Sequence, residues 1–326
     1  MKSLILIISV ILALFSFLNG LDAIRPLDQV STTIVVDQNG KGQFTTVQQA
    51  VDSIPPNNPA WTLIHLNSGV YNEKVEIKTP YIILEGDRDQ QTVIQFGDGG
   101  SVVTSPTFKL NADNFVARYI LFKNTYDRLP SKLAANGVNT TWAPAAAIAG
   151  DRASFYHCSF ISLQDTLTDA KGRHYFYDCQ ISGAIDFIWG NGQSIYENCK
   201  INSLASKIAP RVGFITAQAR ESPEESTGFV FKNCHVTGSG PIHLGRAHTN
   251  YARVLFAGTT MDNVITPEGW DGARNLISFS EANCRGPGAN MSKRVNWEKK
   301  LSDQEVNDLT SLSYINQDGW IEKQPR

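Results

Sequence analysis

The sequence predicts an all-β protein folded as a parallel β-helix. A motif recurs in which an aromatic residue is followed three positions later by Cys and two positions after that by an apolar residue, and its copies begin at positions 155, 176 and 196. A regular period of this length with one short strand per unit, separated by polar and glycine-containing turns, is typical of coiled parallel strands. The two-residue hairpin signals of antiparallel sheets are almost absent between these strands, which favours a β-helix over a β-sandwich.

The repeat extends over much of the chain. Its copies read FYHCSF at 155, FYDCQI at 176, YENCKI at 196 and FKNCHV at 231, with weaker relatives FVARYI at 115 and FAGTTM at 256. Because one repeat cannot bury its apolar face alone, neighbouring repeats must stack. No long linker divides the chain, so we expect a single domain over residues 24–326.

Positions 1–23 are expected to be a secretory signal peptide. The stretch MKSLILIISVILALFSFLNG holds one Lys and a long apolar run. That run of about 16 residues is short for spanning a bilayer and has no basic stop behind it, so cleavage is favoured over a membrane anchor. The sequons at Asn139 and Asn290 fit this route, and we expect a secreted glycoprotein.

Two segments lack the periodic strand pattern and are expected to be helical. FTTVQQAVDSI at 44–54 has a helical stripe of apolar residues that ends at Pro55. This helix is expected to cover the open end of the first coil, where an exposed strand edge could pair with other chains. LSDQEVNDLTSL from 301 predicts a second helix with Ser302 or Asp303 as its N-cap, packed along the outside.

The five Cys residues allow two interpretations. Secretion and an odd count suggest disulfides with one thiol left over, whereas the phase of the repeat suggests a ladder of small buried side chains. Stacked coils bring Cα atoms about 5 Å apart, which permits either arrangement. We expect mostly free, buried thiols.

Charge and motif content exclude several classes of function. The net charge is −2, the pI is near 6.3, and no run of Lys and Arg exceeds two residues, so we expect no nucleic-acid partner and no membrane partner after signal cleavage. The serine-esterase elbow and the phosphate-cradling loop are absent. His243 and His248 differ by five positions and would lie on opposite faces of a strand, so neither a metal site nor a cofactor is expected.

The spacing of two acidic residues suggests a catalytic pair. Asp165 and Asp186 are separated by one period of the repeat and should therefore stack on adjacent coils. Two such carboxylates cannot ionise independently, so one should hold a proton while the other stays charged, giving an acid beside a nucleophile or base. The alternative is that both are turn or capping residues.

Neighbouring residues add to this pair. Asp186 lies between apolar residues in AIDFIWG, where an unpaired charge would be costly, and Arg246 could hold it with two hydrogen bonds. Gln164 precedes Asp165 and offers amide hydrogens to a developing oxyanion.

With these residues, the sequence resembles the plant pectinesterases, or pectin methylesterases, over almost the whole mature chain. The matching blocks are GVYNEKV at 69, GDRASFYHC at 150, QDTL at 164, GAIDFIWG at 183, FITAQAR at 214, LGRAHTNYARV at 244, PEGW at 267 and GPGANMSKRVNW at 286. The resemblance implies a right-handed parallel β-helix that removes methyl esters from cell-wall galacturonan, yielding methanol and a free carboxylate. Few residues separate the leader from the first matching segment, so we expect a member without the inhibitor-like pro-region.

The resemblance also implies a role for each site residue. Asp186 would attack the ester carbonyl, Asp165 would act as acid and then as base, Arg246 would hold Asp186 ionised, and Gln164 would contribute to the oxyanion site. Substrate-binding positions are Thr107, Trp142, Trp189, His248 and Trp270. Trp189 and Trp270 could instead be packing residues. Expected partners are methyl-esterified pectin in the cell wall and a proteinaceous pectinesterase inhibitor, with the enzyme itself a monomer.

Three positions depart from the family pattern. Trp142 stands where most members have an oxyanion-site Gln, His248 stands where a Trp is usual, and Thr168 stands where Tyr is frequent. Losing one oxyanion donor costs about 2.7–4 kcal/mol, roughly 100- to 1000-fold in rate. Trp142 and His248 could partly exchange roles.

Two alternatives to an active pectinesterase follow. One is a weakened or inactive pectin-binding wall protein. The other is a pectate lyase or polygalacturonase on the same fold, for which the sequence offers no convincing carboxylate cluster beyond Asp165 and Asp186.

Overall fold

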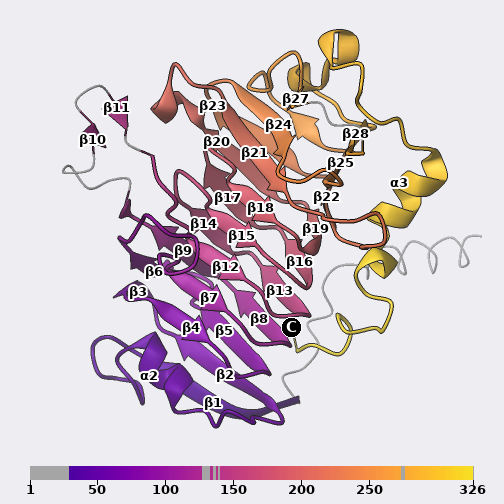
Figure 1. The fold of residues 1–326 in the computed structure, drawn as a ribbon. Coiled ribbons are helices and arrows are strands. Elements are labelled where there is room, and N and C mark those ends of the chain that lie inside the picture. Colours follow the sequence, from indigo (N-terminus) through magenta and orange to yellow (C-terminus); the bar gives the residue numbers. More distant parts are fainter. Residues whose placement is uncertain (1–28, 127–132, 135–136, 139, 273–275, 326) are drawn as a thin grey trace, which may run out of the picture.

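The structure, a computed structural model, describes residues 29–126, 133–134, 137–138, 140–272 and 276–325. The predicted signal peptide and the sequon at Asn139 lie outside the described residues. Within them, nearly all strands run parallel and wind through three sheets, which confirms the predicted β-helix (Figure 1). None of the helices described is long and apolar enough to cross a membrane.

Sheet 1 is the largest of the three and contains ten strands in the described part of the chain. In spatial order they are β1 (Val30–Val36), β2 (Trp61–Leu66), β5 (Ile82–Gly86), β8 (Phe115–Arg118), β13 (Ala153–Tyr156), β16 (Arg173–Tyr177), β19 (Gln193–Glu197), β22 (Gly228–Lys232), β25 (Arg253–Ala257) and β28 (Ser278–Ala282).

Sheets 2 and 3 have eight strands each among the described residues. Sheet 2 consists of β4 (Val75–Ile77), β7 (Phe108–Leu110), β12 (Ala146–Ile148), β15 (Leu167–Asp169), β18 (Ile188–Gly190), β21 (Gly213–Gln218), β24 (Ile242–Ala247) and β27 (Trp270–Asp271). Sheet 3 consists of β3 (Gly69–Asn72), β6 (Thr92–Phe96), β9 (Ile120–Asn124), β14 (Ser159–Ile161), β17 (Gln180–Gly183), β20 (Lys200–Leu204), β23 (His235–Ser239) and β26 (Thr260–Met261). A separate antiparallel pair joins β10 (Leu133–Ala134) to β11 (Gly137–Val138).

The aromatic position of the repeat forms a ladder in the core. The ring centroids of Phe155 and Phe176 lie 4.9 Å apart, and those of Phe176 and Tyr196 lie 4.6 Å apart, with nearly parallel planes. The stack continues through Phe231 to Phe256. Because successive strands are in register, each motif places its aromatic ring on that of the preceding coil, where burial and stacking both stabilise the fold.

The Cys position of the repeat forms a second ladder, of free thiols. All five Cys residues are free, four of them buried and Cys284 half-buried, which confirms the predicted arrangement. The Sγ atoms of Cys179 and Cys199 each lie 3.4 Å from a backbone carbonyl oxygen of the preceding coil. The thiols therefore pack as small apolar groups with a weak hydrogen bond.

The residue before each Cys makes the bend between sheets 1 and 3. These residues have φ between 49° and 56°, in the left-handed region, and they are His157, Asp178, Asn198, Asn233 and Asn283. Asn, Asp and His adopt this conformation more readily than other non-glycine residues. The polar residue before Cys in the motif therefore adopts the backbone conformation that forms the corner of the coil.

Helix α2 (Val47–Asp52) closes the N-terminal end of the coil, as predicted, but it is shorter than the expected 44–54. Phe44 forms a bridge with Val36 of β1, so the helix begins only after Thr46, whose side chain accepts a hydrogen bond from the Gln49 N–H. Its buried residues Val47, Ala50 and Val51 belong to the main core.

The C-terminal segment packs along the outer face of sheet 1, as predicted. It contains α3 (Asp303–Thr310), with Ser302 as the N-cap of a capping box completed by Glu305. Three short 3₁₀ turns also follow β28, and they are η5 (Pro287–Ala289), η6 (Met291–Lys293) and η7 (Leu312–Tyr314). A further 3₁₀ turn, η4 (Ala205–Ile208), lies between β20 and β21. Trp320 and Ile321 are buried against outward side chains of sheet 1 such as Ile195.

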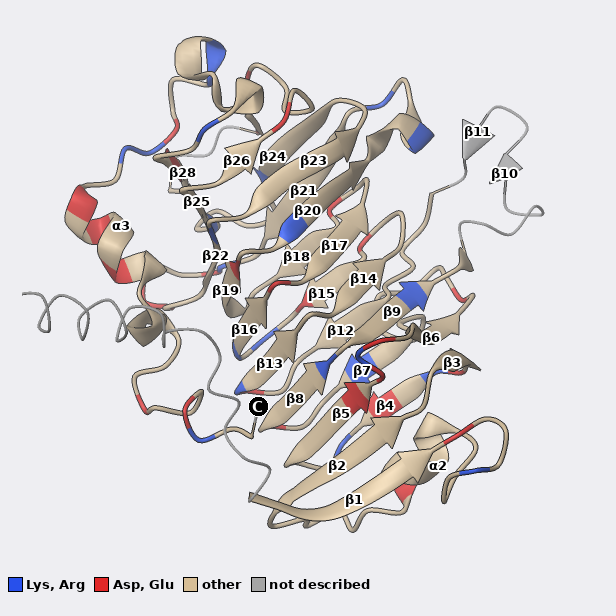
Figure 2. Cartoon of the chain, turned by 180° about the vertical axis from the view of Figure 1, so that it is seen from behind, with Lys and Arg blue, Asp and Glu red and all other residues tan. Residues whose placement is uncertain are grey.

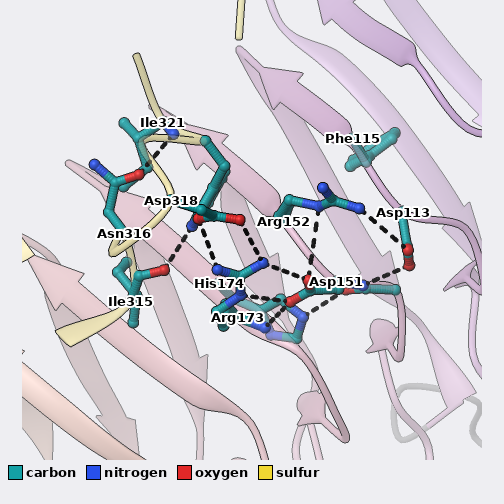
Figure 3. A network of polar contacts seen from close by, with 12 residues as sticks. Asp113, Phe115, Asp151, Arg152, Arg173, His174, Ile315, Asn316, Asp318 and Ile321 are labelled. Atoms are coloured by element: carbon teal, nitrogen blue, oxygen red, sulfur yellow. Dashed lines mark hydrogen bonds and ion pairs between the residues drawn. The ribbon is translucent and has the colours of Figure 1, made fainter. Parts of the chain in front are cut away.

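A polar network fixes the end of this segment to the coil (Figure 3). The Arg173 guanidinium donates to both carboxylate oxygens of Asp151, at 3.0 and 2.7 Å, and to both of Asp318, at 2.8 and 3.2 Å. Gln324 donates to the carbonyl of Arg152 at 2.8 Å. The contacts of Arg173 with Asp318 and of Gln324 with Arg152 join residues that are more than a hundred positions apart in sequence.

Candidate active site

Asp165 and Asp186 occupy the same corner of adjacent coils. Each lies two residues before a strand of sheet 2, and the register pairs Leu167 of β15 with Ile188 of β18. Gln164 forms a bridge with Ile185, so the two Asp residues stand opposite each other. Both have left-handed φ values, 57° and 46°, so they also serve as the turn residues of the alternative interpretation.

Arg246 reaches the pair from β24. Its Nε donates to Asp186 Oδ1 at 2.8 Å and its Nη2 donates to Oδ2 at 2.5 Å, which is the two-bond ion pair expected from the sequence. The guanidinium carbon lies 4.5 Å from the centroid of the Phe214 ring. The residue next to Arg246 in register is Ala217, whose small side chain leaves room for the guanidinium to lie towards Asp186.

The two carboxyl groups differ in environment. Asp165 is 5% exposed, and this burial, together with the negative charge of Asp186, raises its pKa to about 8, although Arg246 opposes the shift. Asp186 is ion-paired to Arg246. Near neutral pH the proton of the pair therefore resides on Asp165, and an acid lies beside an ionised carboxylate.

Strand register separates the two Trp residues proposed to contact sugars. Trp189 pairs with Thr168 and Ala217 in a row of sheet 2 that faces outward, and it is half-buried. Trp270 belongs to the neighbouring row, beside Gly245, and faces inward. It is 1% exposed and its ring stacks on Phe279 at 4.7 Å, so Trp270 is a core residue and the packing alternative applies to it.

The outward row runs the length of sheet 2. Its members are Glu76, Lys109, Ala147, Thr168, Trp189, Ala217, Arg246 and Asp271. At its N-terminal end the charges alternate between β4 and β7, where Lys109 lies 3.3 Å from Glu76 (Figure 2). A cavity of about 690 Å³ extends from there to α2. The row therefore forms a surface long enough for an extended polymer on both sides of the Asp pair.

His248 and Trp142 lie at the margins of this surface. His248 is exposed, and its ring centroid lies 5.9 Å from that of Trp189. Trp142 is 52% exposed, and the next residue, Ala143, donates its N–H to the Gln164 carbonyl at 3.4 Å. The Gln164 side chain is half-buried and forms no hydrogen bond with any residue that the structure describes.

Thr107 does not fit its expected role as a substrate contact. It is fully buried, and its hydroxyl donates to the carbonyl of Lys123 at 3.1 Å. Its side chain points into the coil beside the outward row, so it supports the strand connection and does not reach the surface.

Phe214 is part of the site although the sequence did not predict it. Phe214 occupies the coil position that follows Asp186, carries the guanidinium of Arg246 on its ring and stacks on His243 with centroids 5.3 Å apart. The signal was present in FITAQAR, since Phe214 precedes Thr216 by two residues and Thr216 pairs with Ile188. The longer connection containing η4 broke the period of the repeat and concealed this equivalence.

Comparisons with known proteins give consistent results. The profile of the family described as Pectinesterase matches residues 33–318. The chain is 44% identical to Probable pectinesterase 29 of Arabidopsis thaliana over 309 residues, which cover 92% of each chain. It is also 44% identical over 300 residues to Probable pectinesterase 55 of the same species, covering 90% of this chain and 91% of that one.

Solved structures agree with this result. The pectin methylesterase from carrot superimposes with a TM-score of 0.80 at 28% identity, covering 89% of this chain and 95% of that one. A pectin methylesterase in complex with a hexasaccharide gives a TM-score of 0.75 at 25% identity, covering 91% and 98%.

Proposed function

The chain belongs to the pectinesterase family and is a carboxylic ester hydrolase, and we propose that it removes methyl esters from homogalacturonan with Asp186 as nucleophile and Asp165 as acid and base. The observation that carries this proposal is the asymmetry of the pair. Asp165 is buried and protonated near neutral pH, whereas Asp186 is held as a carboxylate by Arg246.

In the first step, Asp186 attacks the carbonyl carbon of the methyl ester. A tetrahedral intermediate forms with its negative charge on the former carbonyl oxygen, and the Gln164 amide donates to that oxygen. As the intermediate collapses, the bond to the methoxy oxygen breaks. Asp165 gives its proton to that oxygen, so methanol leaves and an acyl-enzyme anhydride remains on Asp186.

In the second step, water replaces methanol. Asp165 is now a carboxylate and takes a proton from a water molecule as the oxygen of that water attacks the acyl carbon. Cleavage of the anhydride releases the galacturonic acid residue, which then loses its proton to solvent, and restores Asp186 as a carboxylate and Asp165 as an acid. Arg246 pairs with Asp186 at both ends of the cycle and keeps its oxygens oriented.

The outward row of sheet 2 is the proposed binding surface for the polymer. A relative of the same fold was solved in complex with a hexasaccharide, and a chain of that length would extend well beyond one sugar on either side of the Asp pair. Trp189 and His248 would contact sugar rings beside Asp186 and Arg246, and exposed Trp142 would contact the chain near Gln164.

The natural setting proposed for this reaction is the plant cell wall. Methyl-esterified pectin would be the substrate, and secretion would follow from the predicted signal peptide at 1–23. Asn290 is exposed, as a glycosylated sequon must be. A proteinaceous inhibitor would act by covering the outward row.

A second candidate function is pectin binding with weak or no turnover. The feature that favours it is Trp142, at the position where the resemblance to the family implies an oxyanion-site Gln. With Gln164 as the remaining side-chain donor, the tetrahedral intermediate would be less stabilised.

Methanol release from highly esterified pectin tests the first candidate against the second. We expect the purified protein to release methanol and the Asp186→Asn variant to release none above background. Binding of pectin without methanol release above that of Asp186→Asn, at any pH from about 5 to 9, would establish the second candidate instead.

A further inference from the structure

A cavity of about 470 Å³ lies away from the Asp pair, at the corner where the last coils pass from sheet 2 to sheet 1. Arg220 follows β21, Arg253 begins β25, and Lys299 comes from the C-terminal segment that covers sheet 1. Figure 1 shows β25 and β28 beside this segment. Three cationic side chains thus line one cavity that the proposed reaction does not use.

The two arginines are held by neutral oxygen atoms. Arg220 is 6% exposed, and its guanidinium donates to the backbone carbonyls of Pro223 and Glu225 at 2.5 and 2.9 Å. The Arg253 guanidinium donates to the Ser226 carbonyl at 3.2 Å and contacts the Tyr314 hydroxyl. Neither guanidinium forms an ion pair with any carboxylate that the structure describes, although Arg173, Arg246 and Arg294 all do.

The positive charge of the two guanidiniums is only partly compensated, because Glu224 and Glu225 act on Arg220 from nearby without pairing with it, whereas Lys299 has Glu305 at 3.5 Å. Burial and the nearby charge of Arg253 lower the pKa of Arg220, so the two guanidiniums act on each other as like charges. A buried charge without a counter-charge is costly, and a planar guanidinium is suited to hold a carboxylate. The cavity therefore has the electrostatic character of an anion site.

Part of the cavity lining is apolar. It includes the half-buried indole of Trp297, Ile277 and the side chain of Leu276, which is 54% exposed. A sugar ring presents C–H groups to such a wall, and a uronic acid adds one carboxylate on its rim. A ligand with both features fits better than a small inorganic anion.

We propose that this cavity binds a galacturonate residue of de-esterified pectin, with its carboxylate on Arg253 and Arg220 and its ring against Trp297. The choice of galacturonate rests on the proposed function, since the reaction creates carboxylates on the polymer it acts upon. Gln218 connects the cavity to the outward row, because it follows Ala217 on β21 and its Oε1 accepts the backbone N–H groups of Arg220 and Arg253 at 3.0 and 2.8 Å. A second binding site there would retain a chain that has already been de-esterified.

Binding of unesterified trigalacturonic acid, measured by titration calorimetry with hydrogen–deuterium exchange, tests this proposal. We expect trigalacturonic acid to protect segments 276–282 and 294–299 from exchange in the natural protein. Arg253→Gln should remove this protection and weaken the cavity site about tenfold, the cost of one charged hydrogen bond. Lys299→Gln changes an exposed residue and should weaken the site by a smaller factor even if Arg253→Gln folds poorly. Arg285→Gln, an exposed arginine outside the cavity, is the matched control and should bind as the natural protein does.

Two results would overturn the proposal. One is an isotherm and exchange pattern that neither Arg253→Gln nor Lys299→Gln changes. The other is equal protection by sulfate at the same concentration, which would make the cavity a site for any small anion.

Methanol release by the same variants separates this inference from the proposed function. An unchanged isotherm with normal methanol release rejects only the cavity site, whereas Arg253-dependent binding without methanol release rejects only the esterase.

Discussion

Replacing Arg246 by Gln tests whether the ion pair with Asp186 supports the reaction. The substitution removes two hydrogen bonds between charged groups, of 2.8 and 2.5 Å. Because the Arg246 side chain is 44% exposed, water can partly replace it. Each hydrogen bond should therefore contribute a free energy at the lower end of the range for charged groups, about 1.5 kcal/mol. The total of about 3 kcal/mol corresponds to a loss of roughly 150-fold in kcat/KM.

The same substitution should also change the pH profile. The positive charge of Arg246 lowers the pKa of Asp165, so its removal should move the alkaline limb of the profile to higher pH. The assay is methanol release from esterified pectin between pH about 5 and 10, with thermal unfolding to verify the fold. Arg246→Lys keeps the charge but not the two-bond geometry and should recover part of the rate. An Arg246→Gln enzyme within threefold of the natural one, with an unmoved alkaline limb, would refute the assigned role.

Three further predictions concern pH, the oxyanion site and the core. Activity should fall as pH rises through about 8, because Asp165 must be protonated to release methanol, and a profile flat to pH 9.5 would contradict this. Trp142→Gln should raise kcat by up to about 100-fold by supplying a second oxyanion donor, whereas Trp142→Phe should give no gain. The imidazole of His174, fully buried between Asp169 and the Gly150 carbonyl, has a raised pKa because the Asp169 charge outweighs burial. Protonated His174 therefore stabilises the folded protein, and this contribution is fully present when the pH is below 6.5, the pKa of His in the unfolded chain. The contribution is lost as the pH rises through the higher pKa of His174 in the folded protein. Asp165, whose pKa is also raised, acts in the same direction, so urea unfolding should show stability falling as pH rises above about 6. His174→Gln should cost about 1–3 kcal/mol at pH about 6 and reduce that dependence without abolishing it.

The repeat allowed the fold to be predicted from sequence. Four coils, those with motifs at 155, 176, 196 and 231, have an aromatic ring, a small thiol and a left-handed bend at equivalent positions, so a single period specifies the strand, the core ladder and the corner together. The prediction was less accurate at α2, where the bridge between Phe44 and Val36 replaced the first helical turn. A local stripe of apolar residues could not reveal that pairing.

The candidate site was predictable only in part, for a related reason. Spacing placed Asp165 opposite Asp186, because one period separates them. Phe214 escaped notice because a longer connection interrupts the period before β21. Trp270 was expected at the surface but faces inward, since a shift of one residue in a strand reverses the side-chain direction. Thr107 is also buried, because it precedes β7 at a corner of the coil, where strand alternation does not apply and its hydroxyl donates to the Lys123 carbonyl.

The sequence by itself determined the coil and the stacking of two carboxyl groups, because both follow from periodic spacing along one chain, and a local apolar stripe indicated the end-covering helix. The structure decided between free thiols and disulfides, since the spacing of stacked coils permits either. Only the tertiary structure decided which carboxyl group holds the proton, which Trp faces outward and which arginines form no ion pair with the carboxylates of the described residues. Those properties depend on burial and on charges supplied by other coils. Burial and the charge of Asp186 on the next coil raise the pKa of Asp165 to about 8 against the opposing charge of Arg246, and no local sequence pattern records this balance.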